Sequence, residues 1–474
     1  MFSSFSALSA RGRGAGRLVA STVVSGLVAV GVLAAAGPAS AAPATADGTT
    51  QTQGGATATI GGLKTFGDAV IHDATGDLTV SAGLFEMSVE GGGTLQTYCV
   101  DLRNPTQRDA KYHETSWSGT SLGANKDAGK IRWILQNSYP QVNDLAALAA
   151  RAKVSGGLTE QDAAAGTQVA IWRYSDGAVV DAVDPQAEQL ADYLEKSARN
   201  LAEPAASLAL DPPAVSGRPG GLLGPVTVHT NAAGVTVTPP ADAATTGVRV
   251  LDKAGKVVTS ATNGSQLFFD VPEDAAAGSA DLTVQASTTV PVGRAFASEG
   301  RSQTQILAGS SESTVSATAS ATWAEQGAIP ALSAVKNCAE GGLDITAVNE
   351  GDEEFGFTLL GAEHTIAAGE TRTVTIPLQE DQAYDLAIEL PGGAEQRFSG
   401  VLDCRTQGSA GGASTQTQTL SEPNPATMSD TTSDVNLAET GSSGATPVIG
   451  GVAIGLVLIG GAALILVRKR QTLD

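Results

Sequence analysis

The sequence predicts a mainly β, multidomain protein whose first folded part mixes strands with helices. Residues 221–325 and 327–404 contain short β-branched runs of period two, such as "GVTVTPP" and "RTVTIPL", separated by Gly, Asp and Pro turns. This pattern is typical of β-sandwiches. Residues 55–208 start with similar runs and continue with helical spacing. We expect an α+β domain (a β-sandwich or barrel with a helical subdomain), a Pro/Gly hinge at 209–220, and two Ig-like β-sandwich modules.

The first 41 residues have the three parts of a secretory signal peptide. Arg11, Arg13 and Arg17 precede an uncharged apolar run, and a small-residue A-x-A site ends at Ala41. This order predicts export with cleavage after Ala41, and a retained membrane anchor is the alternative. Residues 42–54 then form a small, polar leader linker.

The other end of the sequence combines three features in order. Residues 405–436 form a Ser/Thr/Gln-rich spacer that cannot bury a core. An uncharged stretch at 447–467 is long enough to cross a bilayer, and a basic tail follows it. Residues 437–474 as a whole resemble the LPxTG-type sorting signal of Gram-positive cell-wall proteins, in the LAxTG variant associated with class E sortases. The pentapeptide consists of Leu437, Ala438, Glu439, Thr440 and Gly441.

This resemblance implies a location and two partners. A sortase would cleave after Thr440 and join its carboxyl group to a peptidoglycan amine. The protein would then be exported and displayed at the cell surface, anchored to the cell wall.

The exported part of the chain is strongly acidic. The full sequence has a net charge of −21, and removing the six basic residues and the one acidic residue of the two ends takes it to −26. Nucleic acids and anionic lipids need a basic footprint on their partner, so this balance argues against both. The four histidines are scattered and have no paired cysteines near them, which argues against a zinc site. We expect neither a metal nor a cofactor.

The three cysteines raise a question of pairing. Cys338 precedes the first expected strand of the last module and Cys404 ends its last strand, so a disulfide would tie the ends of this module together in an oxidising exterior. Two free thiols are the alternative. With that pair formed, Cys99 is left over in "TYCVDL". It could be a plain buried cysteine, an intermolecular disulfide partner, or the nucleophile of a Cys–His pair with His113.

A helix is expected over residues 159–177, which begin with a capping-box pattern and end at a glycine. Gln168 and Trp172 are four residues apart and therefore lie on one face of this helix. A glutamine thus points the same way as a large aromatic side chain that favours burial.

Two motifs together resemble the thioester domains, or TQxA domains, of Gram-positive surface proteins. "TYCVDL" fits the cysteine motif and "GTQVAIW" fits the TQxA motif, in the same order, and the resemblance covers residues 55–208. It implies that the cysteine side chain is joined to the glutamine of the TQxA motif, which would link Cys99 to Gln168. The motif residues expected to support this bond are Tyr98, Thr167, Ala170 and Trp172.

The chemistry explains why these residue types are needed. A carboxamide is a poor electrophile, so the fold must hold the cysteine sulfur against the amide carbon, where effective molarities reach ~10⁵ M or more. Ammonia leaves and a thioester remains, and burial beside Trp172 and Tyr98 keeps water away from it. The resemblance therefore implies a covalent adhesin, not an enzyme, that reacts once with an amine-bearing ligand (a protein lysine or a polyamine). The alternative is a non-covalent structural or adhesive surface protein with an unreacted Cys99.

Overall fold

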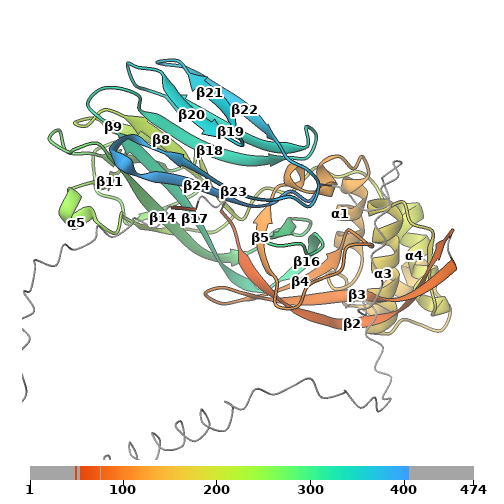
Figure 1. Ribbon diagram of the computed structural model, residues 1–474. Coiled ribbons are helices and arrows are strands. Elements are labelled where there is room, and N and C mark those ends of the chain that lie inside the picture. The colour runs from red at the N-terminus through yellow and green to blue at the C-terminus, as the bar shows by residue number, and fades with distance from the viewer. Residues whose placement is uncertain (1–48, 51–53, 75, 405–474) are drawn as a thin grey trace, which may run out of the picture. The chain divides into compact units, whose positions relative to one another are not determined.

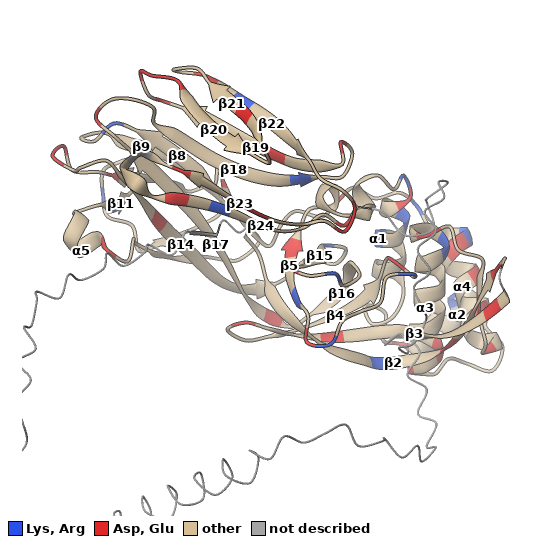
Figure 2. Cartoon of the chain, viewed as in Figure 1, with Lys and Arg blue, Asp and Glu red and all other residues tan. Residues whose placement is uncertain are grey.

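The computed structural model describes residues 49–50, 54–74 and 76–404 of the chain. The expected signal peptide, spacer, sorting pentapeptide and apolar segment at 447–467 all lie outside the described residues. Among the residues that are described, none of the helices is both long enough and apolar enough to span a membrane. Acidic residues lie on loops and strands throughout this part of the chain (Figure 2), in keeping with 49 acidic against 28 basic residues in the sequence.

Six antiparallel strands form a closed ring in the first part of the structure (Figure 1). The hydrogen-bonded order is β3-β4-β16-β15-β5-β2, and a long pairing of β2 with β3 closes it. A closed ring leaves no sheet edge unpaired. The short strand β6 (Val180–Ala182) adds to β2. The ring strands are β2 (Thr57–Asp73), β3 (Gly76–Val89), β4 (Thr94–Cys99), β5 (Lys111–Thr115), β15 (Ala295–Ser298) and β16 (Gln305–Ser310).

Two of these ring strands come from a distant part of the sequence. β15 and β16 lie inside 221–325, which we expected to be a separate β-sandwich module, and they pair with β5 and β4 of the first part. The expected boundary at 209–220 therefore does not separate two independent folds. The reason is that period-two alternation identifies a strand and its buried face but not the strand that pairs with it.

A buried ion pair holds the distant hairpin to the ring. The Glu114 carboxylate on β5 is fully buried and accepts hydrogen bonds from Arg294 Nε at 2.9 Å and from Ser207 N at 2.9 Å. It also accepts from Ala56 N at 3.2 Å. A buried charge is tolerated only when it is paired and hydrogen-bonded, as it is here. Glu114 thus connects the start of β2, the end of the helical region and the approach to β15.

The helices gather beside the ring strands β2 and β3 (Figure 1). The central one, α3 (Glu160–Ser175), begins with the expected capping box, in which Thr159 and Asp162 bond each other's backbone N–H. Most of its residues are buried because it packs between the ring and α4. The expected α+β first domain with a helical subdomain is confirmed. The other elements are η1 (Trp117–Gly119), η2 (Ser121–Gly123), α1 (Ala128–Asn137), α2 (Leu145–Ala152) and α4 (Pro185–Ser197).

The middle part consists of two sheets, ordered β12-β10-β14-β17-β8 and β11-β13-β9-β7. Its core includes the alternate, inward-facing residues of β14 and β17, as their burial patterns show. Two of its strands, β7 (Leu208–Asp211) and β8 (Ala214–Gly217), occupy the stretch that we expected to be a hinge. The others are β9 (Leu222–Thr230), β10 (Val235–Thr238), β11 (Arg249–Leu251), β12 (Ser260–Ala261), β13 (Gln266–Asp270), β14 (Gly278–Thr289) and β17 (Glu312–Trp323), with a short helix α5 (Ala243–Thr246).

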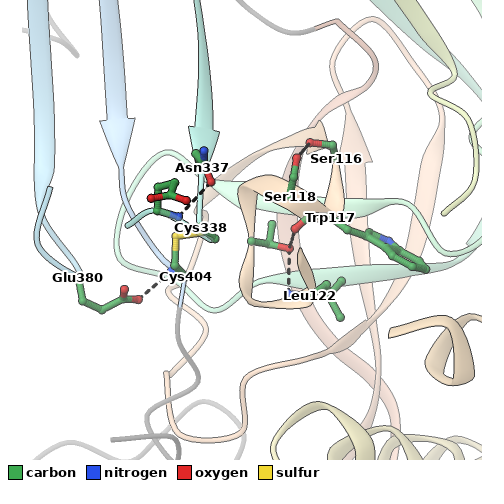
Figure 3. The surroundings of a disulfide bond; sticks show 10 residues. Ser116, Trp117, Ser118, Leu122, Asn337, Cys338, Glu380 and Cys404 are labelled. Carbon is green, nitrogen blue, oxygen red and sulfur yellow. Dashed lines mark hydrogen bonds between the residues drawn. A yellow bond between two sulfur atoms is a disulfide. The ribbon is translucent and has the colours of Figure 1, made fainter. Parts of the chain in front are cut away.

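The last part is a small all-β module with its own apolar core. Its strands pair as β18-β19-β22, β20-β21 and β23-β24, and β1 (Thr49–Thr50) adds in parallel to β24. The expected disulfide between Cys338 and Cys404 is present (Figure 3). The elements are β18 (Pro330–Asn337), β19 (Gly342–Asn349), β20 (Phe355–Leu359), β21 (Ala362–Ile366), β22 (Thr371–Pro377), β23 (Ala383–Glu389), η3 (Pro391–Gly393) and β24 (Glu395–Val401).

Candidate functional site

Cys99 is the last residue of β4, and its cross-strand partner on β16 is Gln305. Val100 N donates to Thr304 O at 3.2 Å, which marks Cys99 and Gln305 as a pair that exchanges no backbone hydrogen bond. In such pairs the two side chains approach each other most closely. Gln305 Nε2 lies 3.3 Å from Cys99 Sγ, and both side chains are buried. The amide carbon of Gln305 is one C–N bond from Nε2 and so lies within about 4.7 Å of the sulfur.

Gln168 contacts the same cysteine in a different way. Gln168 Nε2 donates to Cys99 O at 2.9 Å, and Gln168 Oε1 accepts from Cys99 N at 3.0 Å. These backbone groups point away from β16 because Cys99 and Gln305 do not bond each other's backbone. The Gln168 amide therefore bonds Cys99 in the way that a neighbouring strand would, on the side away from β16.

This geometry shows two amides at Cys99, and the predicted link between Cys99 and Gln168 stays a prediction. The structure brings Cys99 and Gln168 together, as the two motifs implied, but through the main chain of Cys99. The amide at the sulfur belongs to Gln305, which the sequence reasoning missed. Gln305 lies 206 residues after Cys99, in "TQTQILAG". The sequence contains one signal for Gln305, which stands next to Ile306 and Leu307 in a strand-like run. A glutamine buried in such a strand needs hydrogen-bond partners for its amide.

The oxygen of the Gln305 amide also has a partner. Thr97 Oγ1 donates to Gln305 Oε1 at 2.9 Å, and the Thr97 side chain is fully buried. Thr97 and Cys99 are two residues apart on β4, so their side chains lie on the same face. A donor at this oxygen stabilises the negative charge that develops there when a nucleophile attacks the amide carbon.

The expected support residues are all buried around this pair. Tyr98 points to the opposite face of β4, where its hydroxyl donates to Tyr139 O at 2.9 Å. The Thr167 hydroxyl donates to Ala163 O at 2.6 Å within α3. Ala170 and Trp172 lie in the core of the same helix, with exposed fractions of 0% and 2%. All four side chains are therefore shielded from water, as the motifs predicted for a buried site.

Burial dominates the electrostatics of the site. Burial raises the pKa of the Cys99 thiol to about 12, and hydrogen bonds with Gln305 and Thr106 oppose this rise. Burial, reinforced by the charge of Asp176, raises the pKa of Asp101 to about 7, and burial raises the pKa of Asp176 to about 6. Asp176 Oδ1 also accepts from Leu102 N at 3.0 Å. Two carboxyl groups with raised pKa values thus lie near Cys99: Asp101 just after it in the chain, and Asp176 at the end of α3.

Two other candidates lie away from this pair. The ring nitrogens of His113 bond Thr57 Oγ1 and the Glu299 carboxylate, so His113 is not paired with Cys99. Within the described residues, one group of carboxylates has the spacing to hold a metal ion, at the end of the last module. It consists of Glu380, Asp381 and Asp403.

Comparison with known proteins identifies the type of domain that contains Cys99. Residues 96–200 match the family model of the thioester domain. No curated protein matches the sequence. One similar solved structure is the Bacillus anthracis TIE protein, with 13% identity, a TM-score of 0.26, and coverage of 73% of this chain and 63% of that one. Another is the thioester domain of the Enterococcus faecium TIE86 protein, with 17% identity, a TM-score of 0.26, and coverage of 59% and 99%. The chain therefore contains a thioester domain, and it spans 63% of the length of the Bacillus anthracis protein.

Proposed function

We propose that this protein is a surface adhesin in which Cys99 forms an intramolecular thioester with Gln305 and transfers the acyl group to an amine of a partner. The observation that carries this assignment is the 3.3 Å distance between Gln305 Nε2 and Cys99 Sγ across two paired strands. The thioester-domain match supports the type of chemistry. The choice of Gln305 over Gln168 rests on the contacts of the two amides.

The thioester forms when the Cys99 sulfur replaces the amide nitrogen of Gln305. The Cys99 sulfur gives up its proton and attacks the amide carbon of Gln305, the C–N bond breaks, and the nitrogen leaves as ammonia with that proton. The Thr97 hydroxyl stabilises the oxygen during the attack. Because Sγ and the amide are held together on paired strands, the reaction needs no encounter in solution.

Gln168 acts here as a positioning residue. Its amide holds both backbone groups of Cys99, so it fixes the end of β4 and with it the direction of the sulfur. Burial of the pair protects the thioester from hydrolysis.

In the second step an amine of the partner breaks the thioester. A partner amine attacks the carbonyl carbon of Gln305, the C–S bond breaks, and the sulfur takes up the proton released by the amine. The products are an amide between Gln305 and the partner and a free Cys99 thiol. The reaction occurs once per molecule, so the protein is not an enzyme. The partner class is a protein lysine or a polyamine.

Display at the cell surface is part of the proposal. The apolar run ending at the A-x-A site supports export, and the LAxTG pentapeptide with its apolar segment and basic tail supports attachment to peptidoglycan by a sortase, of class E by its alanine. The Ser/Thr/Gln-rich spacer, residues 405–436, would hold the folded part away from the wall.

The test is the intact mass of the exported segment 42–436, purified near neutral pH without added amine. The wild-type protein should weigh one ammonia less than its sequence, whereas Cys99→Ala and Gln305→Ala should have their full sequence masses. Gln168→Ala should still lose ammonia, more slowly or in part of the molecules. Methylamine should add to Gln305, as located by fragmentation.

Two results would contradict the proposal in different ways. A wild-type protein at full sequence mass would favour the alternative, a non-covalent surface protein with an unreacted Cys99. A methylamine adduct on Gln168 would keep the thioester but return it to the TQxA glutamine.

A further inference from the structure

We infer that a pocket beside Cys99 is the entrance for the partner's amine, and that it selects a primary amine on an unbranched aliphatic arm such as a lysine side chain. This inference rests on the thioester proposed above. The pocket has a volume of about 350 Å³ and is formed by β2, β3 and the loop before β5. Its lining includes Ile60, Leu63, Phe66, Phe85, Thr106 and Asp109. We call it the entry pocket.

Strand register places the entry pocket next to the reacting pair. Thr97, which contacts the Gln305 amide, is paired with Phe85 on β3, and Phe85 is paired with Leu63 on β2. The apolar wall of the pocket thus lies on the two strands that follow β4 around the ring.

The loop that closes the entry pocket also touches the site. Thr106 is 3% exposed, and its side chain is near enough to the Cys99 thiol to oppose the rise that burial causes in the pKa of that thiol. It also bonds the side-chain amide of Gln303, while Gln107 N donates to Ser302 Oγ at 2.8 Å. The loop is therefore attached to the segment that leads into Gln305. The larger groove of about 780 Å³ near Tyr384 shares no lining residue with the contacts of Cys99.

The lining of the entry pocket matches the two ends of a lysine side chain. Its walls are apolar, and Phe66 at the surface is 36% exposed, so the methylene stem of a lysine has a hydrophobic surface to cover. Asp109 lies exposed on the loop beside Arg108, and Arg108 is already engaged within the protein. The Asp109 carboxylate attracts an ammonium group to the opening.

The experiment uses the exported segment 42–436 after its mass has shown the loss of ammonia. Release of the Cys99 thiol is timed with n-pentylamine, with tert-butylamine and with hydroxylamine, a small and uncharged nucleophile at neutral pH. Each rate is divided by that of a simple thioester in solution, which removes the intrinsic reactivity of the amine. The variants are Phe66→Ala and Asp109→Asn. Their matched controls are Leu78→Ala, an apolar residue 53% exposed on β3, and Asp274→Asn, exposed in the middle part.

The corrected rate should be higher for n-pentylamine than for tert-butylamine. Phe66→Ala should lower the n-pentylamine rate by about five-fold, because the stem loses apolar contact, and should leave the hydroxylamine rate unchanged. Asp109→Asn should lower the n-pentylamine rate by about three-fold at low salt and less at high salt. Both controls should react like the wild type.

Equal n-pentylamine rates in Phe66→Ala, Asp109→Asn and their controls would overturn the inference. This failure differs from failure of the thioester itself, in which the wild-type protein would show neither ammonia loss nor thiol release with hydroxylamine.

Discussion

The ring and the disulfide-linked module each bury a side-chain amide, and the two amides are treated differently. Asn349 in the module bonds only to backbone: its oxygen accepts from Ile329 N and Gly351 N, and its nitrogen donates to Glu353 O. Gln305 in the ring bonds to side chains, and its nitrogen points at the Cys99 sulfur.

Under the proposed function, this difference separates a structural amide from a reactive one. A buried polar group is costly unless it is satisfied, and backbone groups satisfy Asn349 fully. Sulfur is a weak acceptor, so the contact of Gln305 with Cys99 adds little stability as a hydrogen bond. The cysteines differ in the same way: Cys338 and Cys404 form the disulfide of the module, whereas the Cys99 sulfur lies 3.3 Å from the amide nitrogen of Gln305. The proposed reaction therefore belongs to the ring, where a polar group is buried at little gain in stability.

The largest effect should come from separating the ring into its two sequence halves. A fragment of residues 42–208 lacks β15, β16 and Gln305, so its ring stays open and it should show no loss of ammonia. A fragment of residues 42–324 contains all six ring strands and should be one ammonia lighter than its sequence. Intact mass and circular dichroism compare the two. A folded 42–208 fragment that has lost ammonia would place the thioester on Gln168 and show that the ring is dispensable.

Removal of the disulfide should affect the module and spare the ring. Cys338→Ser with Cys404→Ser should lower the free energy of unfolding of residues 327–404 by about 4 kcal/mol on the chain-entropy model. Thermal unfolding measures this change, and intact mass should still show the loss of ammonia. One hydrogen bond joins the disulfide to the first part of the structure: Cys338 N donates to Ser118 O at 3.2 Å, beside η1 (Figure 3). Loss of the thioester in this double variant would mean that the two regions fold as one cooperative unit.

Substitution of Thr97 should slow the chemistry while leaving the fold in place. Thr97→Val keeps the shape of the side chain but removes the donor to Gln305 Oε1, so thiol release by methylamine should slow by about 100-fold. Thr97→Ser keeps the hydroxyl and should react at close to the wild-type rate. A Thr97→Val protein with an unchanged rate would show that this hydroxyl only packs against the amide.

The smallest expected effect is a pH dependence of stability. It comes from carboxyl groups of the ring and of the disulfide-linked module that lie near each other. Burial raises the pKa of Asp403 to about 7, and the charge of Asp101 adds to the rise. Glu380 and Asp381 act in the same direction, and Lys336 opposes them.

The sign of the pH dependence follows from these raised values. A carboxyl group with a raised pKa is protonated in the folded protein when it is already ionised in the unfolded chain. Its contribution to stability is full below about pH 4 and is lost as the pH rises through about 7. Asp403→Asn should therefore stabilise the protein at pH 8 by on the order of 2 kcal/mol and have little effect at pH 4. Chemical denaturation at the two pH values measures this difference, and Asp274→Asn serves as the surface control. Equal stabilisation at both pH values would contradict the raised pKa.

Much of this protein can be read from local patterns. The capping box at Thr159 predicts the start of α3, and alternating β-branched residues predict the strands of the middle and last parts. Cysteine position predicts the Cys338–Cys404 disulfide, and two short motifs indicate a thioester domain around Cys99. Each of these features depends on residues within one turn, strand or short motif, or on two cysteines at the ends of one module. Such features can be predicted from the sequence, because the residues that determine them are close together in it.

The tertiary structure decided which strands form the ring and which amide meets the sulfur. β4 pairs with a strand 206 residues later, and no local pattern specifies that partner. Gln168 was the plausible choice because it lies on a buried helix face near Trp172. It bonds the backbone of Cys99 instead, because the N–H and C=O groups of Cys99 point away from β16. A cross-strand neighbour, Gln305, is the residue that lies at the sulfur, since only directly paired positions in a sheet bring two side chains this close.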